Sequence, residues 1–197
     1  MFYEVLKQVE NDFNERIQWE SFLELIRYKD PIRNAWFETL RTEINNCFAV
    51  ENVVENWGYI SRNIWDYRWY IKEFDYESFC LLFNNHSFHL WANRNFYDIK
   101  KLSHFLSEKR FIPIISSFDR TNDINDENNE FKIVEKGNFA FGDASDGKYG
   151  DIDQLAWYAR FRTKEFVEQI RKKVDRFRKN EEVTNLLIEI NRECKLP

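Results

Sequence analysis

The chain has 197 residues, of which 43% are hydrophobic and 18% aromatic, with only five glycines and three prolines. Disordered chains have few aromatic residues and many chain breakers, so this composition excludes a largely disordered protein. The net charge of −5 argues against a general affinity for nucleic-acid backbones. The length allows one core of good size, and we expect a single domain over residues 1–197.

The cysteines and the N-terminal residues indicate where the protein works. Cys47, Cys80 and Cys194 are scattered, and an odd number without a CxxC pair predicts reduced thiols in a cytosol. Residues 1–12 have acids where a signal peptide has an apolar stretch, and no apolar run reaches membrane-spanning length. We therefore expect a cytoplasmic protein without a membrane partner. Abundant asparagine and scarce alanine indicate an AT-rich genome, such as that of a bacterium or phage.

The N-terminal part, about residues 1–60, is predicted to be helical. Apolar residues at helical spacing predict a first helix over about the first thirty residues. Pro31 is expected to end it, because the residue before a proline avoids the α region. A second helix is predicted over 33–48. The stretch 50–63 is ambiguous, since Gly58 interrupts it.

The middle part, about residues 64–141, is predicted to be an antiparallel sheet with a helix packed on it. From Ile64 the apolar period changes to two, which predicts a strand with Trp65, Tyr67 and Trp69 on one face and Tyr70 on the other. Further strands are predicted over 79–83 and 88–92, joined as a hairpin, and over 111–118. Residues 131–141 are predicted to form a strand or a hairpin. A helix is predicted over 96–110, and a solvated loop over 119–130.

The C-terminal part, about residues 152–194, is predicted to form long helices. An apolar stripe at steps of three and four predicts one helix over 152–179, and a second is expected over 181–194. The predicted order is N-terminal helices, a central antiparallel sheet and long C-terminal helices. That order is typical of the α+β class.

The stretch GDASDGKYGDIDQ at 142–154 resembles neither a calcium loop nor a phosphate loop closely. A calcium loop needs a glutamate where Gln154 stands, and a Walker loop needs serine or threonine where Tyr149 stands. A turn that leads into a helix with Asp151 as its N-cap explains the residues more simply. A weak metal site at Asp143 and Asp146 is the alternative.

One pattern is typical of metal-dependent nucleases. Asp119 follows a predicted strand, and Glu130 and Lys132 open the next one with their side chains on the same side. In nucleases with an Asp…Glu-x-Lys set, carboxylates hold a divalent ion such as Mg²⁺ while the lysine positions water. Specificity is poor, because a chain this charged contains Glu-x-Lys by chance. We keep a nuclease, or a nuclease-derived nucleic-acid-binding domain, as the alternative function.

The predicted helix over 152–179 also carries many bases. Arg171, Lys172 and Arg176 are the ones that would follow a phosphate backbone. A solvated helix face is the simpler interpretation, since such a face usually accompanies an apolar stripe.

The main hypothesis is a small acidic cytosolic protein that binds another protein, without catalysis and without a cofactor. Aromatic side chains beside charges are typical of interface hot spots, and acids attract a basic partner. Immunity or antitoxin-like proteins and subunits of bacterial or phage defence systems fit this description. The expected interface combines sheet aromatics with acids of the 119–130 loop: Trp65, Trp69, Tyr70, Asp119, Asp123, Asp126 and Glu127.

Overall fold

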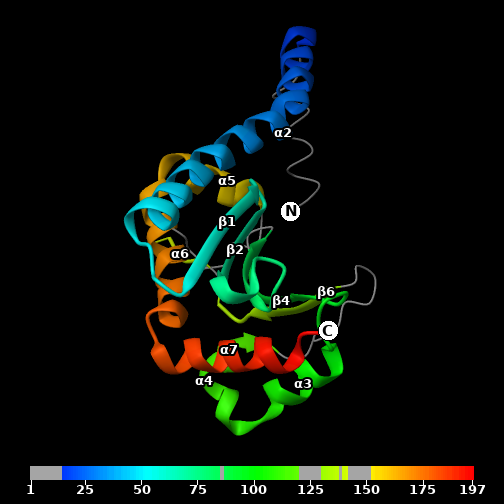
Figure 1. Ribbon diagram of the computed structural model, residues 1–197. Helices are drawn as coiled ribbons and strands as arrows, with labels where there is room; N and C mark the ends of the chain where they lie inside the picture. The colour runs from blue at the N-terminus through cyan, green and yellow to red at the C-terminus, as the bar shows by residue number, and fades with distance from the viewer. Residues whose placement is uncertain (1–14, 85–86, 120–129, 138, 142–151) are drawn as a thin grey trace.

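The computed structural model describes residues 15–84, 87–119, 130–137, 139–141 and 152–197. It has a long N-terminal helix, a six-stranded antiparallel sheet and C-terminal helices, which confirms the α+β class (Figure 1). The strand order is β1-β2-β3-β4-β6-β5. The expected acids Asp123, Asp126 and Glu127, the weak metal pair Asp143 and Asp146, and the predicted cap Asp151 all lie outside the described residues.

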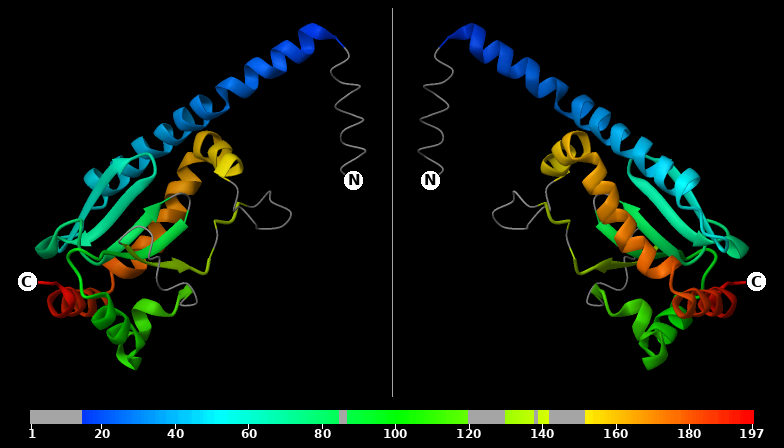
Figure 2. Two further views of the ribbon diagram at one scale, coloured as in Figure 1. Left: turned by 90° about the vertical axis from the view of Figure 1, so that its right-hand side faces the viewer. Right: turned by 90° about the vertical axis from the view of Figure 1, so that its left-hand side faces the viewer.

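The long N-terminal helix does not end at Pro31. Helix α2 runs over Arg16–Asn45 with Pro31 inside it and continues into the short π-helix η1, Asn46–Glu51. The predicted break was wrong because a proline removes one backbone hydrogen bond but does not forbid a helix that other turns support. Phe37, Leu40 and Ile44 are the buried residues of α2. Residues 16–32, here called the α2 arm, project away from the rest of the protein (Figures 1 and 2).

The sheet begins earlier than the sequence pattern predicts. Strand β1 covers residues that were ambiguous because of Gly58, and it pairs with β2. Gly58 lies opposite Tyr70, and a Cβ at Gly58 would lie 2.4 Å from the Tyr70 ring, so the glycine makes room for that ring. The predicted hairpin over 79–92 is confirmed by β3 and β4. The strands are β1 (Trp57–Asn63), β2 (Asp66–Ile71), β3 (Cys80–Asn84), β4 (Ser87–Asn93), β5 (Phe118–Asp119) and β6 (Glu130–Glu135).

The segment between β4 and β5 is mostly helical. Helix α3, Ile99–Ser107, confirms the predicted helix with shorter ends, and its N-cap Asp98 accepts hydrogen bonds from the backbone of Lys100 and Lys101. The strand predicted over 111–118 is wrong. Its apolar run forms the turn α4, Ile112–Ile115, and only Phe118 and Asp119 are extended. A short apolar run fits a buried helical turn as well as a strand, and here a proline stands in the first turn.

Three helices form the C-terminal part: α5 (Ile152–Phe161), α6 (Thr163–Arg178) and α7 (Glu181–Cys194). The bounds predicted for the last helix are confirmed. The single helix predicted over 152–179 is divided at Arg162, whose backbone angles of −132° and 37° are not helical. The break lets α5 lie against α2 while α6 follows the sheet (Figure 2).

The helices pack on one face of the sheet. Alternate strand residues such as Tyr67, Trp69, Phe83 and Ile133 point into one large aromatic core with α2, α6 and α7. Such rings bury a large apolar area per side chain. The opposite face carries a smaller cluster that includes Trp91. Polar and charged residues gather there.

Candidate functional site

Aromatic side chains and basic side chains without an ion pair lie together where α2 meets the junction of α5 and α6. We call this surface the aromatic–basic face and define it by Trp36, Trp157, Arg160, Phe161 and Lys164. Trp157 is 44% exposed and Phe161 58% exposed, whereas the other side of α5 is buried. Trp157 and Phe161 are four residues apart, so they lie on the same side of the helix, with their ring centroids 5.3 Å apart and their planes tilted by 36°. The edge of the Phe161 ring meets Trp36 of α2.

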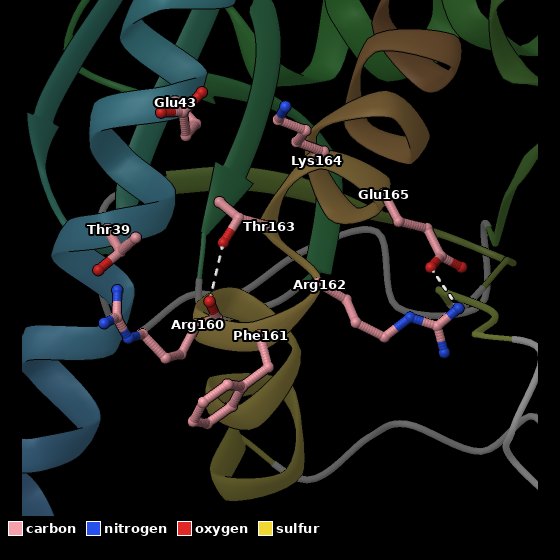
Figure 3. Close-up of a pocket in the computed structure, with 8 residues that line it drawn as sticks. All are labelled: Thr39, Glu43, Arg160, Phe161, Arg162, Thr163, Lys164 and Glu165. Carbon is pink, nitrogen blue, oxygen red and sulfur yellow. Dashed lines mark hydrogen bonds and ion pairs between the residues drawn. The ribbon is translucent and has the colours of Figure 1, made fainter.

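The break at Arg162 arranges the charges of this face. The Thr163 hydroxyl donates to the carbonyls of Ala159 at 2.7 Å and Arg160 at 3.2 Å, which closes the end of α5. Arg160 then extends toward α2 near Thr39, while Arg162 turns the other way to pair with Glu165 (Figure 3). In the described part of the chain, no ion pair neutralises Arg160 or Lys164. The face therefore has two available positive charges.

Three residues of the face, Arg160, Phe161 and Lys164, border a pocket of about 510 Å³ between α2 and the α5–α6 junction. Thr39 and Glu43 of α2 line one wall, and Arg160, Phe161 and Lys164 line the other (Figure 3). Such a hollow with an aromatic wall and cations can take an apolar anchor together with a carboxylate. The sequence analysis did not find this face. The sequence pattern that could have revealed it is the pair Trp157 and Phe161, which lies on one side of a helix whose other side is apolar.

The expected interface on the sheet is only partly exposed. Trp69 is 1% exposed and packs against Phe48, with ring centroids 4.9 Å apart. The expectation of an exposed ring was wrong for Trp69, because it points to the helix-covered face of β2. Trp65 precedes that strand and contacts Phe37, and it is half-buried. Tyr70 is half-buried on the opposite face.

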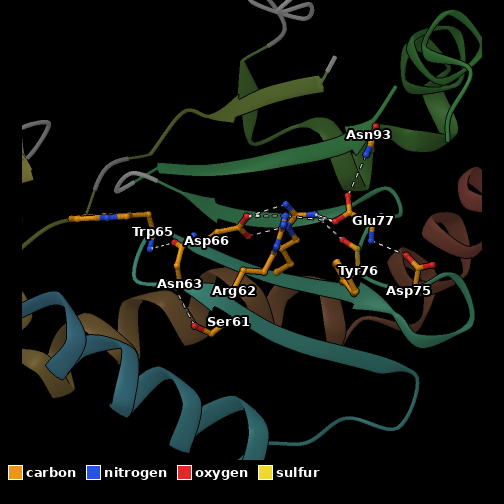
Figure 4. A network of polar contacts seen from close by, with 10 residues as sticks. Ser61, Arg62, Asn63, Trp65, Asp66, Asp75, Tyr76, Glu77 and Asn93 are labelled. Carbon is orange, nitrogen blue, oxygen red and sulfur yellow. Dashed lines mark hydrogen bonds and ion pairs between the residues drawn. The ribbon is translucent and has the colours of Figure 1, made fainter. Parts of the chain in front are cut away.

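That opposite face holds a connected polar network (Figure 4). The guanidinium of Arg68, which is 3% exposed, donates to both carboxylate oxygens of Asp66 at 2.9 Å and stacks on Trp91 at 4.0 Å. Burial alone would lower the pKa of Arg68, but the hydrogen bonds that Arg68 donates to Asp66 and the negative charge of Asp66 outweigh that effect and raise it. Glu77 lies 3.3 Å from Arg68 and 3.6 Å from Arg62. The charges satisfy one another, so this network stabilises the sheet and offers no free charge.

The nuclease residues do not converge on one point. Asp119 pairs with Val134 of β6, four residues from Glu130. Four residues of a strand span about 13 Å, whereas oxygens that share a metal ion lie about 2 Å from it. Burial lowers the pKa of Lys132, although the charges of Glu130 and Asp66 oppose that shift. Across the described ranges, no three His, Cys, Asp or Glu residues form a group suited to a metal ion.

The basic run of α6 is largely neutralised within the fold. Arg171 pairs with Glu168 at 2.8 Å, and Lys172 lies 3.8 Å from the same carboxylate. Arg176 contacts the buried Glu135 of β6 at 2.6 Å. A phosphate backbone would have to compete with these carboxylates, so the geometry favours the solvated-face interpretation.

Within the described part, no helix combines the length and the apolar character needed to span a bilayer. Comparisons with models of known protein families, with curated proteins and with solved structures gave no match.

Proposed function

We propose that the protein works by binding another protein, without catalysis, through the aromatic–basic face. The observation that carries the proposal is the exposed pair Trp157 and Phe161 beside Arg160 and Lys164. Tryptophan and arginine are the residues that contribute most often to interface hot spots, and aromatic rings are enriched at interface centres. A partner that covers these rings would exclude water from both the rings and the cations.

The local charge favours an acidic segment of the partner. Arg162 and Glu165 of the lining neutralise each other, and Arg160 and Lys164 outnumber the remaining carboxylate, Glu43 on the opposite wall. A partner carboxylate beside Arg160 and Lys164 would form charge-assisted hydrogen bonds. This differs from the basic partner expected from the net charge of −5. Long-range attraction and local contacts are separate effects, and the contacts decide where the partner docks.

Within this proposal we keep the functional class expected from the sequence, which is an immunity or antitoxin-like protein or a subunit of a defence system. Such proteins act by occupying a partner and need no cofactor. A cytoplasmic site of action is part of the proposal, and the three free, buried cysteines support it.

The test is capture of partners from the native host by the tagged full-length chain. The variant is Phe161→Asp, which puts a charge in the centre of the face. The matched control is Val53→Asp, which changes a similarly exposed apolar residue after η1. We expect a partner that is retained by the wild type and the control and lost by Phe161→Asp, with all three folded by circular dichroism. A partner retained equally by all three contradicts the location of the site.

A further inference from the structure

The α2 arm exposes a second apolar surface, separate from the aromatic–basic face. Ile17, Leu25, Tyr28 and Ile32 are 67%, 65%, 53% and 39% exposed and form one apolar stripe. With 3.6 residues per turn, these four side chains and Ser21 fall within an arc of roughly 80°. Trp19, Leu23 and Ile26 are also exposed, at 46%, 37% and 51%, but lie on the other side of the arm. Lys29 and Arg33, which bind Asp153 of α5, lie on a different side of the helix. The stripe ends at Ile32, one turn before Trp36.

The charges of the arm are divided along its length. Residues 15–24 contain three glutamates and one arginine, a net charge of −2, and residues 25–34 contain three bases and one aspartate, a net charge of +2. Asp153 offsets part of the positive half, but Arg27 lies on the side away from α5. A copy of the arm placed in the opposite direction would set each acidic half against a basic half. A parallel copy would set like charges together.

The side-chain sizes match the same arrangement. Consider an antiparallel pair of arms related by a two-fold axis near Leu25. Both helices rise equally per residue, so the residue numbers of two opposite side chains add up to about 49. Ile17 then faces Ile32, the small Ser21 faces the large Tyr28, and Leu25 meets its own copy. Symmetric dimers use one surface twice in this way.

We propose that a second copy of the chain covers the stripe, with the two α2 arms antiparallel. Dimer formation removes four apolar side chains of each copy from water, and this removal is the main driving force for association. Glu24 borders the stripe, and in this register it comes within reach of Arg27 of the second copy. By symmetry, Arg27 comes within reach of Glu24 of the second copy. These two equivalent contacts fix the direction of the pair. The inference rests on the stripe alone and does not depend on the aromatic–basic face.

The experiment is analytical ultracentrifugation of the full-length chain from about 1 to 100 µM, because a dimer forms by mass action. We expect a mass that approaches twice the 24.2 kDa of one chain. Leu25→Asp should weaken the dimer at least about 100-fold, since it places two charges at the axis. Glu24→Arg and Arg27→Glu should each weaken it by about threefold to tenfold. The double variant should recover wild-type affinity, because the charge pair is restored in reverse.

Three controls make each outcome decisive. Val53→Asp should leave the dimer unchanged, and circular dichroism should confirm that the exposed-site variants fold. Leu25→Cys should cross-link two chains on oxidation, because the native thiols are buried. A monomer throughout the range, a dimer that ignores Leu25→Asp, or charge reversals without mutual rescue would each overturn the proposal. A monomer whose stripe another protein protects would show a different occupant and would also overturn it.

Discussion

Trp36 of α2 and Phe161 of α5 meet edge to face, with ring centroids 5.6 Å apart and an angle of 74° between the ring planes. Such a contact contributes about 0.5–1.5 kcal/mol beyond the buried area. It fixes the end of α5 against α2 and holds Phe161 in one position at the surface. A ring that is already held in place loses little conformational freedom when a partner covers it. The fold thus prepares the aromatic–basic face for binding.

The first prediction concerns the buried charge pair of β2. Asp66→Ala should reduce the free energy of unfolding by about 3–5 kcal/mol, because it leaves the buried guanidinium of Arg68 without its main partner. Urea denaturation measures the change. Glu73→Ala is the control, since it breaks an exposed pair with Arg192 and should cost less than about 1 kcal/mol. Equal losses in both variants would show that the Asp66–Arg68 pair is no more than a surface contact.

The second prediction concerns a buried amide in α7. The side chain of Asn191 donates to the carbonyls of Phe79 and Leu187 and accepts from the backbone N–H of Phe79 and the hydroxyl of Tyr97. Asn191→Leu should cost about 1–3 kcal/mol for each group left without a partner. Asn185→Leu on the exposed side of the same helix should stay within about 0.5 kcal/mol. Similar melting temperatures for the two variants would contradict this role.

The third prediction concerns thiol reactivity. Burial raises the pKa of the thiols of Cys47, Cys80 and Cys194, the last to about 11. The reactive thiolate is therefore scarce at pH 8, and access is also blocked. A chromogenic disulfide reagent should react with none of the three thiols in the native state and with all three in urea. Rapid labelling of the native protein would contradict the burial of these cysteines.

The fourth prediction is that the purified protein does not cleave nucleic acid with Mg²⁺ or Mn²⁺. The register that separates Asp119 from Glu130 gives no common position for an ion. A fluorescence assay on single- and double-stranded substrates measures cleavage. Activity that disappears in both Asp119→Ala and Lys132→Ala, with folding intact, would restore the nuclease hypothesis.

Periodicity in the sequence was sufficient for elements whose pattern was long or strictly alternating. The helix over Glu181–Cys194, the β3–β4 hairpin and the α+β class were predicted from it. It failed where tertiary contacts decide between alternatives. Pro31 continues a helix, Arg162 interrupts one, and Gly58 lies within a strand because the Tyr70 ring needs the space.

The site was harder to predict than the fold. A strand pattern places Tyr67 and Trp69 on one face but does not say which face the helices cover, so Trp69 was taken for a surface ring. The aromatic–basic face joins residues of α2, α5 and α6 that are more than a hundred positions apart in sequence. Only the contact between the helices brings them together.

Binding kinetics of the captured partner test the central claim most directly. The account predicts that Trp157→Ala mainly speeds dissociation, because the ring supplies desolvated contact area. It predicts that Lys164→Glu mainly slows association and reduces its dependence on salt, because the charge acts at a distance. Surface plasmon resonance at two salt concentrations separates the two effects. Association and dissociation rates that neither substitution changes would contradict binding through the aromatic–basic face.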